Sequence, residues 1–113
     1  MKKKTCDALI VGGGAAGMMA ALTAARRGLS VLLIEKNAEL GRKLLLTGKG
    51  RCNLTNDSSP REVMSSVPRN GKFLYSSLTR FPPQAVMDFF ESIGVPVKVE
   101  RGGRVFPVSD RAG

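Results

Sequence analysis

A glycine-rich turn between two apolar runs constrains this chain more than any other feature. The turn, Gly12-Gly13-Gly14-Ala15-Ala16-Gly17, directly follows the apolar run Ala8-Leu9-Ile10-Val11. Residues 15–27 are rich in alanine and methionine and contain no proline, which is typical of a helix. A second apolar run, residues 30–34, then ends at Glu35. Short continuous apolar runs are typical of strands buried on both faces of a parallel sheet, so the pattern predicts a right-handed strand–helix–strand unit.

The glycines of the turn satisfy the G-x-G-x-x-G pattern, and each has a physical task. Gly12 permits the tight turn out of the strand, and Gly14, which has no Cβ, lets the backbone approach a pyrophosphate. Gly17 lets the helix pack closely against the strand. Ala15 and Ala16 keep the approach unobstructed. The turn therefore predicts a pyrophosphate site at the start of the helix, where free amides and the helix dipole favour anions.

Glu35 supplies the second half of the same fingerprint. It ends the second strand about 20 residues after the glycines, where an acidic side chain accepts hydrogen bonds from the adenosine ribose. A carboxylate at this position repels a 2′-phosphate, so FAD and NAD fit and NADP does not fit well. The fingerprint does not separate FAD from NAD. A glycine-rich turn that holds no ligand is the alternative structural interpretation.

Positive charge is concentrated just after the second strand. The chain has 113 residues and a formal charge of +9, from 18 Lys and Arg against 9 Asp and Glu. The cations in question lie between glycines, in the stretch that contains Lys36, Arg42, Lys43, Lys49 and Arg51. This pattern predicts a mostly irregular, phosphate-facing loop over residues 36–59. A solvated basic surface is the alternative that stays open.

The later part of the chain has weaker signals. Residues 82–92 carry apolar residues at helical spacing with proline at the start, which predicts a helix. Residues 95–99 and 104–108 are predicted strands joined through a turn at 101–103. Because Leu, Ile, Val and Ala are concentrated in the first 46 positions, we expect a regular core there and a looser region after it.

The aromatic residues allow two interpretations. Phe73, Tyr75, Phe81, Phe89 and Phe90 among cations resemble a nucleic-acid-stacking pattern, but core packing is favoured because Phe89 and Phe90 share an amphipathic helix. No known nucleic-acid-binding motif is visible. The sequence therefore predicts no nucleic-acid partner.

The cysteines and the N-terminal residues indicate which cellular compartment and which kinds of site the sequence favours. Cys6 and Cys52 form no CxxC pair, and histidine is absent, so no metal site and no Ser/His/Asp triad is predicted. Free thiols favour a reducing cytoplasm. Lysines before an apolar stretch imitate a secretory signal, but Asp7 and the glycines interrupt that stretch. It also falls short of the ~20 residues that span a bilayer, so no membrane association is predicted.

Two further motifs carry a family resemblance. The segment from Gly41 to Asn56, which includes GRK and TGKGRCN-x-TN, is followed by GRVFP-x-SD from Gly103. In this order the motifs resemble those of the BaiN/YhiN-like bacterial flavoproteins, and the likeness runs over the whole chain. The resemblance implies an α/β, glutathione-reductase-like FAD domain, and family members are roughly three to four times longer. We therefore expect residues 1–113 to be the N-terminal part of an incomplete FAD domain. It would comprise a Rossmann-like βαβ unit (5–35), a flavin-side loop (36–59) and a less regular α+β helix-and-hairpin segment (60–113).

The resemblance also implies roles for individual residues. Gly12, Gly14, Ala16 and Gly17 would contact the pyrophosphate, Glu35 and Lys36 the adenosine ribose, and Arg42 and Lys43 the phosphates or adenosine. Residues 48–53 would run beneath the flavin, and the site residues expected there are Gly48, Gly50, Arg51, Cys52 and Asn53. Relatives that reduce disulfides use a cysteine pair near the flavin, but here Cys52 is single, so flavin packing is favoured over thiol catalysis.

The expected function follows from these motifs. The chain is predicted to belong to a cytoplasmic FAD-dependent oxidoreductase, with NAD(P)H or a substrate as electron donor and the flavin as the reactive group. The alternatives are a non-catalytic NAD- or ADP-binding sensor module and a basic nucleic-acid-binding protein. Catalytic residues, substrate and oligomeric state are left unassigned.

Overall fold

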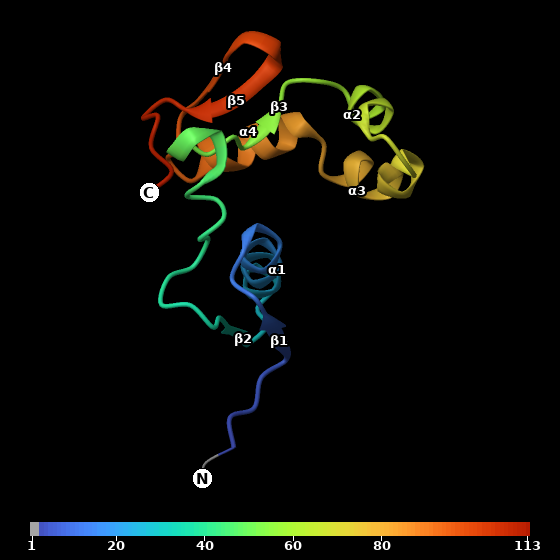
Figure 1. Ribbon diagram of the computed structural model, residues 1–113. Coiled ribbons are helices and arrows are strands. Elements are labelled where there is room, and N and C mark those ends of the chain that lie inside the picture. The colour runs from blue at the N-terminus through green and yellow to red at the C-terminus, as the bar shows by residue number, and fades with distance from the viewer. Residues whose placement is uncertain (1–2) are drawn as a thin grey trace. The chain divides into compact units, whose positions relative to one another are not determined.

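The computed structural model describes residues 3–113 and divides the chain between Leu45 and Leu46 into two compact units. The first unit contains the glycine-rich turn, and the second contains the helix-and-hairpin segment (Figure 1). Within residues 3–113, no helix is both long and apolar enough to cross a membrane.

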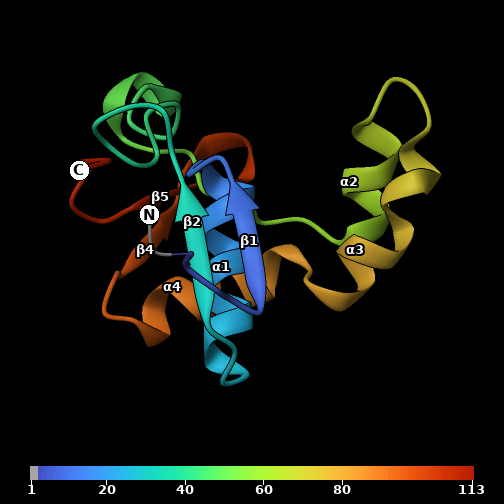
Figure 2. The ribbon, with the colours of Figure 1, turned by 90° about the horizontal axis from the view of Figure 1, so that it is seen from below.

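The first unit is a βαβ unit, as predicted. Strand β1 (Ala8–Val11) pairs with β2 (Val31–Ile34) in parallel, with Ala8 opposite Val31 and Val11 opposite Ile34. Helix α1 (Ala15–Arg26) connects the strands and packs on one face of the pair (Figure 2). The predicted α/β class with parallel strands is therefore confirmed.

The ends of these elements differ from the prediction by one residue each. α1 ends at Arg26 rather than Arg27, since Gly28 follows with φ +81° and turns the chain away. β2 begins at Val31 rather than Ser30. Ser30 is held by Asp7, whose Oδ2 accepts hydrogen bonds from the Ser30 amide (2.8 Å) and hydroxyl (3.1 Å).

The prediction that these strands are buried on both faces is wrong for this chain. Val11 is 80% exposed, Leu9 57% and Ile34 48%. The reason is that α1 covers one face of a two-stranded sheet, and the described part of the first unit has no element on the other face.

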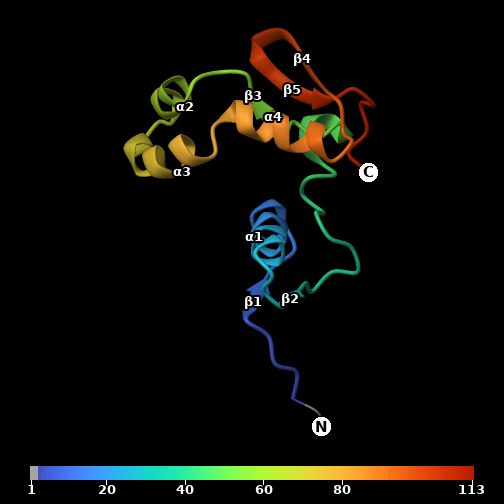
Figure 3. The same ribbon diagram turned by 180° about the vertical axis from the view of Figure 1, so that it is seen from behind.

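The second unit is built on a three-stranded antiparallel sheet of order β3–β5–β4. Its strands are β3 (Thr55–Asn56), β4 (Val97–Val99) and β5 (Arg104–Pro107), and helix α4 (Pro83–Ser92) contacts β3 and β4 (Figure 3). The turn predicted between β4 and β5 is confirmed as the short 3-10 segment η3 (Arg101–Gly103). Both hairpin strands are shorter than predicted.

The most buried apolar side chains lie in this second unit, which contradicts the expected position of the core. Val105 and Phe106 of β5 are 0% and 1% exposed, and Met87 of α4 and Cys52 are each 7% exposed. Phe89 and Phe90 of α4 are half-buried and make an edge-to-face pair with centroids 5.1 Å apart. The apolar composition predicted a core in the first 46 residues. The three-stranded sheet of the second unit, however, is packed between α4 and a loop, so its side chains are more buried than those of the two-stranded sheet, which is covered on one face only.

A helical hairpin that the sequence left unassigned precedes α4. It consists of α2 (Pro60–Ser66), the 3-10 turn η2 (Gly71–Leu74) and α3 (Tyr75–Arg80), and we call residues 59–81 the helical arm. Ser59 caps α2 by accepting a hydrogen bond from the Glu62 amide (3.2 Å), with Pro60 at the first helical position. A Cβ on Gly71 would overlap the Met64 carbonyl, so glycine there lets η2 pack against α2.

Three aromatic side chains of the helical arm project into solvent. Phe73 is 86% exposed, Tyr75 62% and Phe81 40%. The sequence favoured core packing for all five aromatic residues of residues 73–90, and for these three that prediction is wrong. The reason is that the arm packs through a separate set of half-buried apolar residues, namely Val63, Met64, Val67, Leu74 and Leu78.

Candidate functional site

The glycine-rich turn has the close packing that the sequence predicts. Gly12 has φ +100°, and its amide donates to the Ile34 carbonyl at 2.8 Å, which turns the chain at the end of β1. A Cβ on Gly17 would overlap the Gly12 carbonyl oxygen. Only glycine at position 17 therefore lets α1 start so close to the strand.

The start of α1 presents backbone amides to open space. The first hydrogen bond of the helix runs from the Met18 amide to the Gly14 carbonyl (2.9 Å), and no side chain caps the helix. The amides of Ala15, Ala16 and Gly17 precede that bond and have no acceptor inside the helix. Gly14 is exposed, and a Cβ built on it would meet no atom within 4 Å. An anion can therefore approach this end of α1 without displacing any part of the first unit.

Glu35 lies beside the glycine-rich turn. Its Oε1 accepts a hydrogen bond from the Gly13 amide (3.2 Å), and its Oε2 accepts one from the Asn37 amide (3.0 Å). The hydrogen bonds from Asn37 and then Gly13 lower the pKa of Glu35, so the side chain is a carboxylate near neutral pH. The structure thus brings the predicted ribose carboxylate and the predicted phosphate turn together.

The loop after Glu35 folds back onto the turn, which the sequence analysis did not anticipate. The Gly41 amide donates to the Gly13 carbonyl at 2.8 Å, and a Cβ on Gly13 would overlap the Leu40 side chain. Gly13 and Gly41 are both buried. Gly41, the glycine of the GRK motif, has φ +65°, a backbone conformation that favours glycine.

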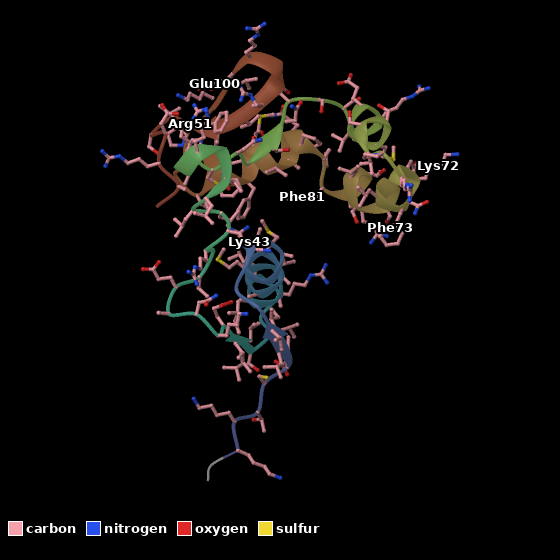
Figure 4. All side chains as sticks on the ribbon, viewed as in Figure 1. Lys43, Arg51, Lys72, Phe73, Phe81 and Glu100 are labelled. Carbon is pink, nitrogen blue, oxygen red and sulfur yellow. The ribbon has the colours of Figure 1, made fainter. Side chains whose placement is uncertain are left out.

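The cations predicted to contact the nucleotide are exposed. Lys36, Arg42 and Lys43 all reach solvent, and Arg42 Nη1 donates to the Asn37 Oδ1 at 3.3 Å (Figure 4 labels Lys43). Asn37 therefore contacts Glu35 through its amide and Arg42 through its side chain. Arg42 is thereby linked to the Glu35 carboxylate through Asn37.

The other predicted site residues lie in the second unit, in a tightly turned loop around the 3-10 segment η1 (Thr47–Gly50). Left-handed backbone conformations concentrate there, at Gly48, Lys49, Gly50 and Cys52. For Lys49 and Cys52 this conformation is strained, because neither is glycine. A Cβ on Gly48 would lie 2.6 Å from Phe106 Cε1, so the loop packs directly on the ring of Phe106.

Arg51 is engaged by partners within the second unit. Its guanidinium carbon lies 3.9 Å from the centroid of the Phe106 ring, and its Nη1 lies 2.9 Å from Glu100 Oε2 and 3.3 Å from Asp110 Oδ1 (Figure 4). Lys98 contacts the same two acids, at 3.3 Å and 2.7 Å. Arg51, Lys98, Glu100 and Asp110 form what we call the charge network, which ties the η1 loop to the hairpin and to the C-terminal segment.

Cys52 and Asn53 are also held by backbone atoms. The Cys52 amide donates to the Thr47 carbonyl at 3.0 Å, and its side chain is buried. In the amide orientation that satisfies both of its polar atoms, Asn53 donates to the carbonyls of Thr55 (3.0 Å) and Val105 (3.2 Å). Cys6 is half-buried and unpaired. No group of three or more His, Cys, Asp or Glu that could hold a metal ion is found among residues 3–113.

Comparison with known proteins places this fold in a family. Residues 6–113 match the family described as HI0933-like protein Rossmann domain, which covers nearly all of the chain. The chain belongs to the HI0933-like family.

Individual relatives of this HI0933-like domain carry the names of redox enzymes. The chain is 38% identical over 105 residues to the 3-dehydro-bile acid delta(4,6)-reductase of Clostridium scindens, covering 91% of the chain and 25% of that protein. It is 38% identical over 101 residues to the ribosomal RNA dihydrouridine synthase of Escherichia coli (88% and 24%). It is 34% identical over 85 residues to the 3-oxosteroid 1-dehydrogenase of Mycolicibacterium smegmatis (74% and 15%).

These matches confirm the family resemblance and the expectation of an oxidoreductase family. The chain spans about a quarter of the length of the first two curated relatives.

The charge network gives this HI0933-like domain a predicted pH dependence. Hydrogen bonds from Arg51 lower the pKa of Glu100, and hydrogen bonds from Lys98 lower the pKa of Asp110. Because both pKa values fall on folding, their stabilising contribution is present above the unfolded values of 4.5 and 3.8 and is lost as the pH falls through the folded values. We expect the urea midpoint of unfolding to decrease between pH 6 and pH 3.

Hydrogen bonds also lower the pKa values of Asp7 and Glu35, so a variant of the network is needed as control. Replacing Glu100→Gln and Asp110→Asn together removes the network's carboxylates, and the acid decrease should then become shallower than in the unmodified protein. Equal slopes for the two proteins would show that the network contributes nothing to folding stability. Added salt should weaken the difference, because the pairs are solvent-accessible.

Proposed function

We propose that this chain holds the ADP part of FAD in a flavoprotein oxidoreductase. The observation that carries the proposal is the open, amide-lined start of α1 with an ionised carboxylate fixed beside it. The open space around Gly14 and the uncapped end of α1 fit a pyrophosphate.

We propose a separate set of contacts for the pyrophosphate and for the ribose of the nucleotide. The amides of Ala15, Ala16 and Gly17 would bind the pyrophosphate, which approaches over Gly14. Each Glu35 oxygen accepts one protein amide, and a carboxylate oxygen has a second lone pair, so both can still accept from ribose hydroxyls. The same negative charge disfavours a 2′-phosphate, which supports FAD or NAD over NADP.

The cationic loop and the η1 loop are proposed to complete the contacts. Lys36, Arg42 and Lys43 are exposed, and we propose that they contact phosphate or adenosine, for which Arg42 would exchange its hydrogen bond to Asn37. For Gly48, Gly50, Cys52 and Asn53 we propose contact with the flavin side of the cofactor through the tightly turned backbone. Arg51 would act by fixing the shape of that loop, since Glu100 and Phe106 already occupy its guanidinium.

We further propose that the whole protein oxidises or reduces a carbon–carbon bond next to a ring carbonyl. Bound flavin supplies two-electron chemistry, and the protein supplies orientation and electrostatics. The relatives support this class: one name specifies a delta(4,6)-reductase of a 3-dehydro-bile acid, and another a 1-dehydrogenase of a 3-oxosteroid. The double bond that is reduced in forming dihydrouridine is likewise conjugated to a ring carbonyl. NAD(P)H is the proposed donor, and the unpaired cysteines fit a reducing cytoplasm.

Purification of the protein from its complete reading frame tests the cofactor. We expect a yellow protein that releases flavin absorbance into solution on denaturation. A colourless protein that binds NAD or ADP would instead support the non-catalytic sensor module. For the reaction class, flavin reduced under anaerobic conditions should be reoxidised by a cyclic enone and not by an isolated cyclic alkene. Equal reoxidation by both compounds would contradict the proposed chemistry.

A further inference from the structure

The peptide bond between Gly13 and Gly14 is held in one orientation by the loop that follows β2. The Gly13 carbonyl accepts a hydrogen bond from the Gly41 amide at 2.8 Å, and Gly13 and Gly41 are both buried. In a planar trans peptide the C=O and N–H groups point in opposite directions. The N–H of Gly14 therefore points away from Gly41.

The Gly14 amide is available to a ligand. Gly14 is exposed, and within the part of the chain that the structure describes its amide donates to no acceptor. Its carbonyl accepts from the Met18 amide at 2.9 Å, so the peptide bond that follows Gly14 is fixed as well. Gly14 thus adds a fourth amide, whose direction is fixed, to those of Ala15, Ala16 and Gly17 at the start of α1.

The backbone conformation of Gly41 makes this contact possible. Gly41 has φ +65°, and its carbonyl accepts from the Leu45 amide at 3.2 Å, so it starts one helical turn with its own N–H directed at Gly13. A Cβ on Gly41 would lie 3.2 Å from Met18 Cε, which is the flexible end of a side chain. The left-handed backbone, more than a lack of space, therefore requires glycine at position 41.

We propose that Gly41 is a positioning residue for the pyrophosphate of the nucleotide. By holding the Gly13 carbonyl, Gly41 directs the Gly14 N–H outwards, where it donates to a phosphate oxygen together with the amides at the start of α1. A donor that is already oriented binds an anion more tightly, because no free energy is spent on orienting it. The inference rests on the proposed function and deepens it, since it assigns a task to a residue outside the G-x-G-x-x-G turn.

The Gly14 amide can be observed directly by NMR in the complete protein after its flavin has been removed. Isotope-labelled glycine makes the resonance visible, and Gly14→Ala assigns it. We expect the amide proton to move downfield when ADP is added, because a phosphate oxygen accepts its hydrogen bond. Adenosine, which has no phosphate, should move it much less. A Gly14 resonance that ADP leaves in place would overturn the proposal.

Substitution of Gly41 tests the positioning role by calorimetric titration. Valine is strongly disfavoured at positive φ, so Gly41→Val should move the Gly41 amide away from Gly13. The dissociation constant of ADP should rise about tenfold to a hundredfold, the range for one hydrogen bond to a charged group. The affinity for adenosine should be nearly unchanged, since the Gly13 and Asn37 amides hold Glu35. Gly41→Asn should retain most of the ADP affinity, because asparagine adopts left-handed conformations more readily.

Gly28→Val is the matched control for the loss of a left-handed glycine. Gly28 follows the C-terminal end of α1 with φ +81°, and a Cβ there would meet no atom within 4 Å. This variant should lower the urea midpoint of unfolding, as Gly41→Val does, but keep the ratio of ADP affinity to adenosine affinity of the unmodified protein. If Gly41→Val keeps that ratio too, the contact only stabilises the loop, and the positioning role is refuted.

The experiment also separates this inference from the proposed function. The flavin content of the unmodified protein reports on FAD binding and depends on no substitution. A yellow protein in which ADP does not move the Gly14 resonance would leave the flavoprotein proposal standing and refute the positioning role. A protein that binds neither FAD nor ADP would refute the proposed function, and with it this inference.

Discussion

Replacing Gly14 by valine should abolish flavin binding while the protein stays folded. Gly14 has φ −83° and ψ −169°, a backbone conformation open to any residue, and its Cβ would point into empty space. The new side chain should therefore leave the first unit folded, and it would occupy the space over the α1 amides where we propose that the pyrophosphate binds. Loss of the glycine from the helix N-cap adds a destabilisation of about 1 kcal/mol. Flavin absorbance per protein and the urea midpoint measure the two effects.

Two further variants serve as controls for Gly14→Val. Ala20→Val places the same side chain at an exposed position of α1 beyond the turn and should retain flavin. Gly17→Val should destabilise the first unit itself, since its Cβ overlaps the Gly12 carbonyl. Full flavin content in a folded Gly14→Val protein would exclude a pyrophosphate at this helix end.

Replacing Glu35 by arginine should weaken FAD binding by about a hundredfold or more. The carboxylate is proposed to accept two ribose hydroxyls, and hydrogen bonds to charged groups contribute about 1.5–3 kcal/mol each. The substitution also leaves the Gly13 and Asn37 amides without their acceptor. Flavin affinity is measured by reconstituting the apoprotein with FAD.

Glu39→Arg provides the matched control for charge. It makes the same change on an exposed position of the same loop and should leave FAD affinity nearly unchanged. If the two variants lose affinity equally, the net charge of the loop matters and the ribose contact of Glu35 does not.

The βαβ unit could be predicted from sequence because its signals are local. Strand, glycine turn and helix follow one another without interruption, and each glycine's task depends on its immediate neighbours. Glu35 was located by its distance from the turn, and the structure places its carboxylate on the Gly13 amide. The contact of Gly41 with Gly13 could not be predicted, because a backbone hydrogen bond across a loop leaves no periodic pattern.

The second unit was harder to predict for a different reason. Phe106 is almost fully buried because Gly48 and Arg51 pack on its ring, and those contacts join residues more than fifty positions apart. Composition pointed to the alanine- and leucine-rich first part, whereas burial depends on how many layers surround a side chain. The exposure of Phe73 has the same origin, since hydrophobicity alone does not tell whether a neighbouring layer exists.

Gly13 is fixed from three sides, by the Glu35 carboxylate, the Gly41 amide and the Leu40 side chain. An engineer who wished this domain to accept a nucleotide with a 2′-phosphate would normally exchange the acidic residue for a small or basic one. Here that exchange also removes the anchor of the turn, so it has to be combined with a new acceptor for the Gly13 amide. In the proposed site, coenzyme preference and the integrity of the loop thus depend on the same residue, Glu35, and a redesign has to change both together.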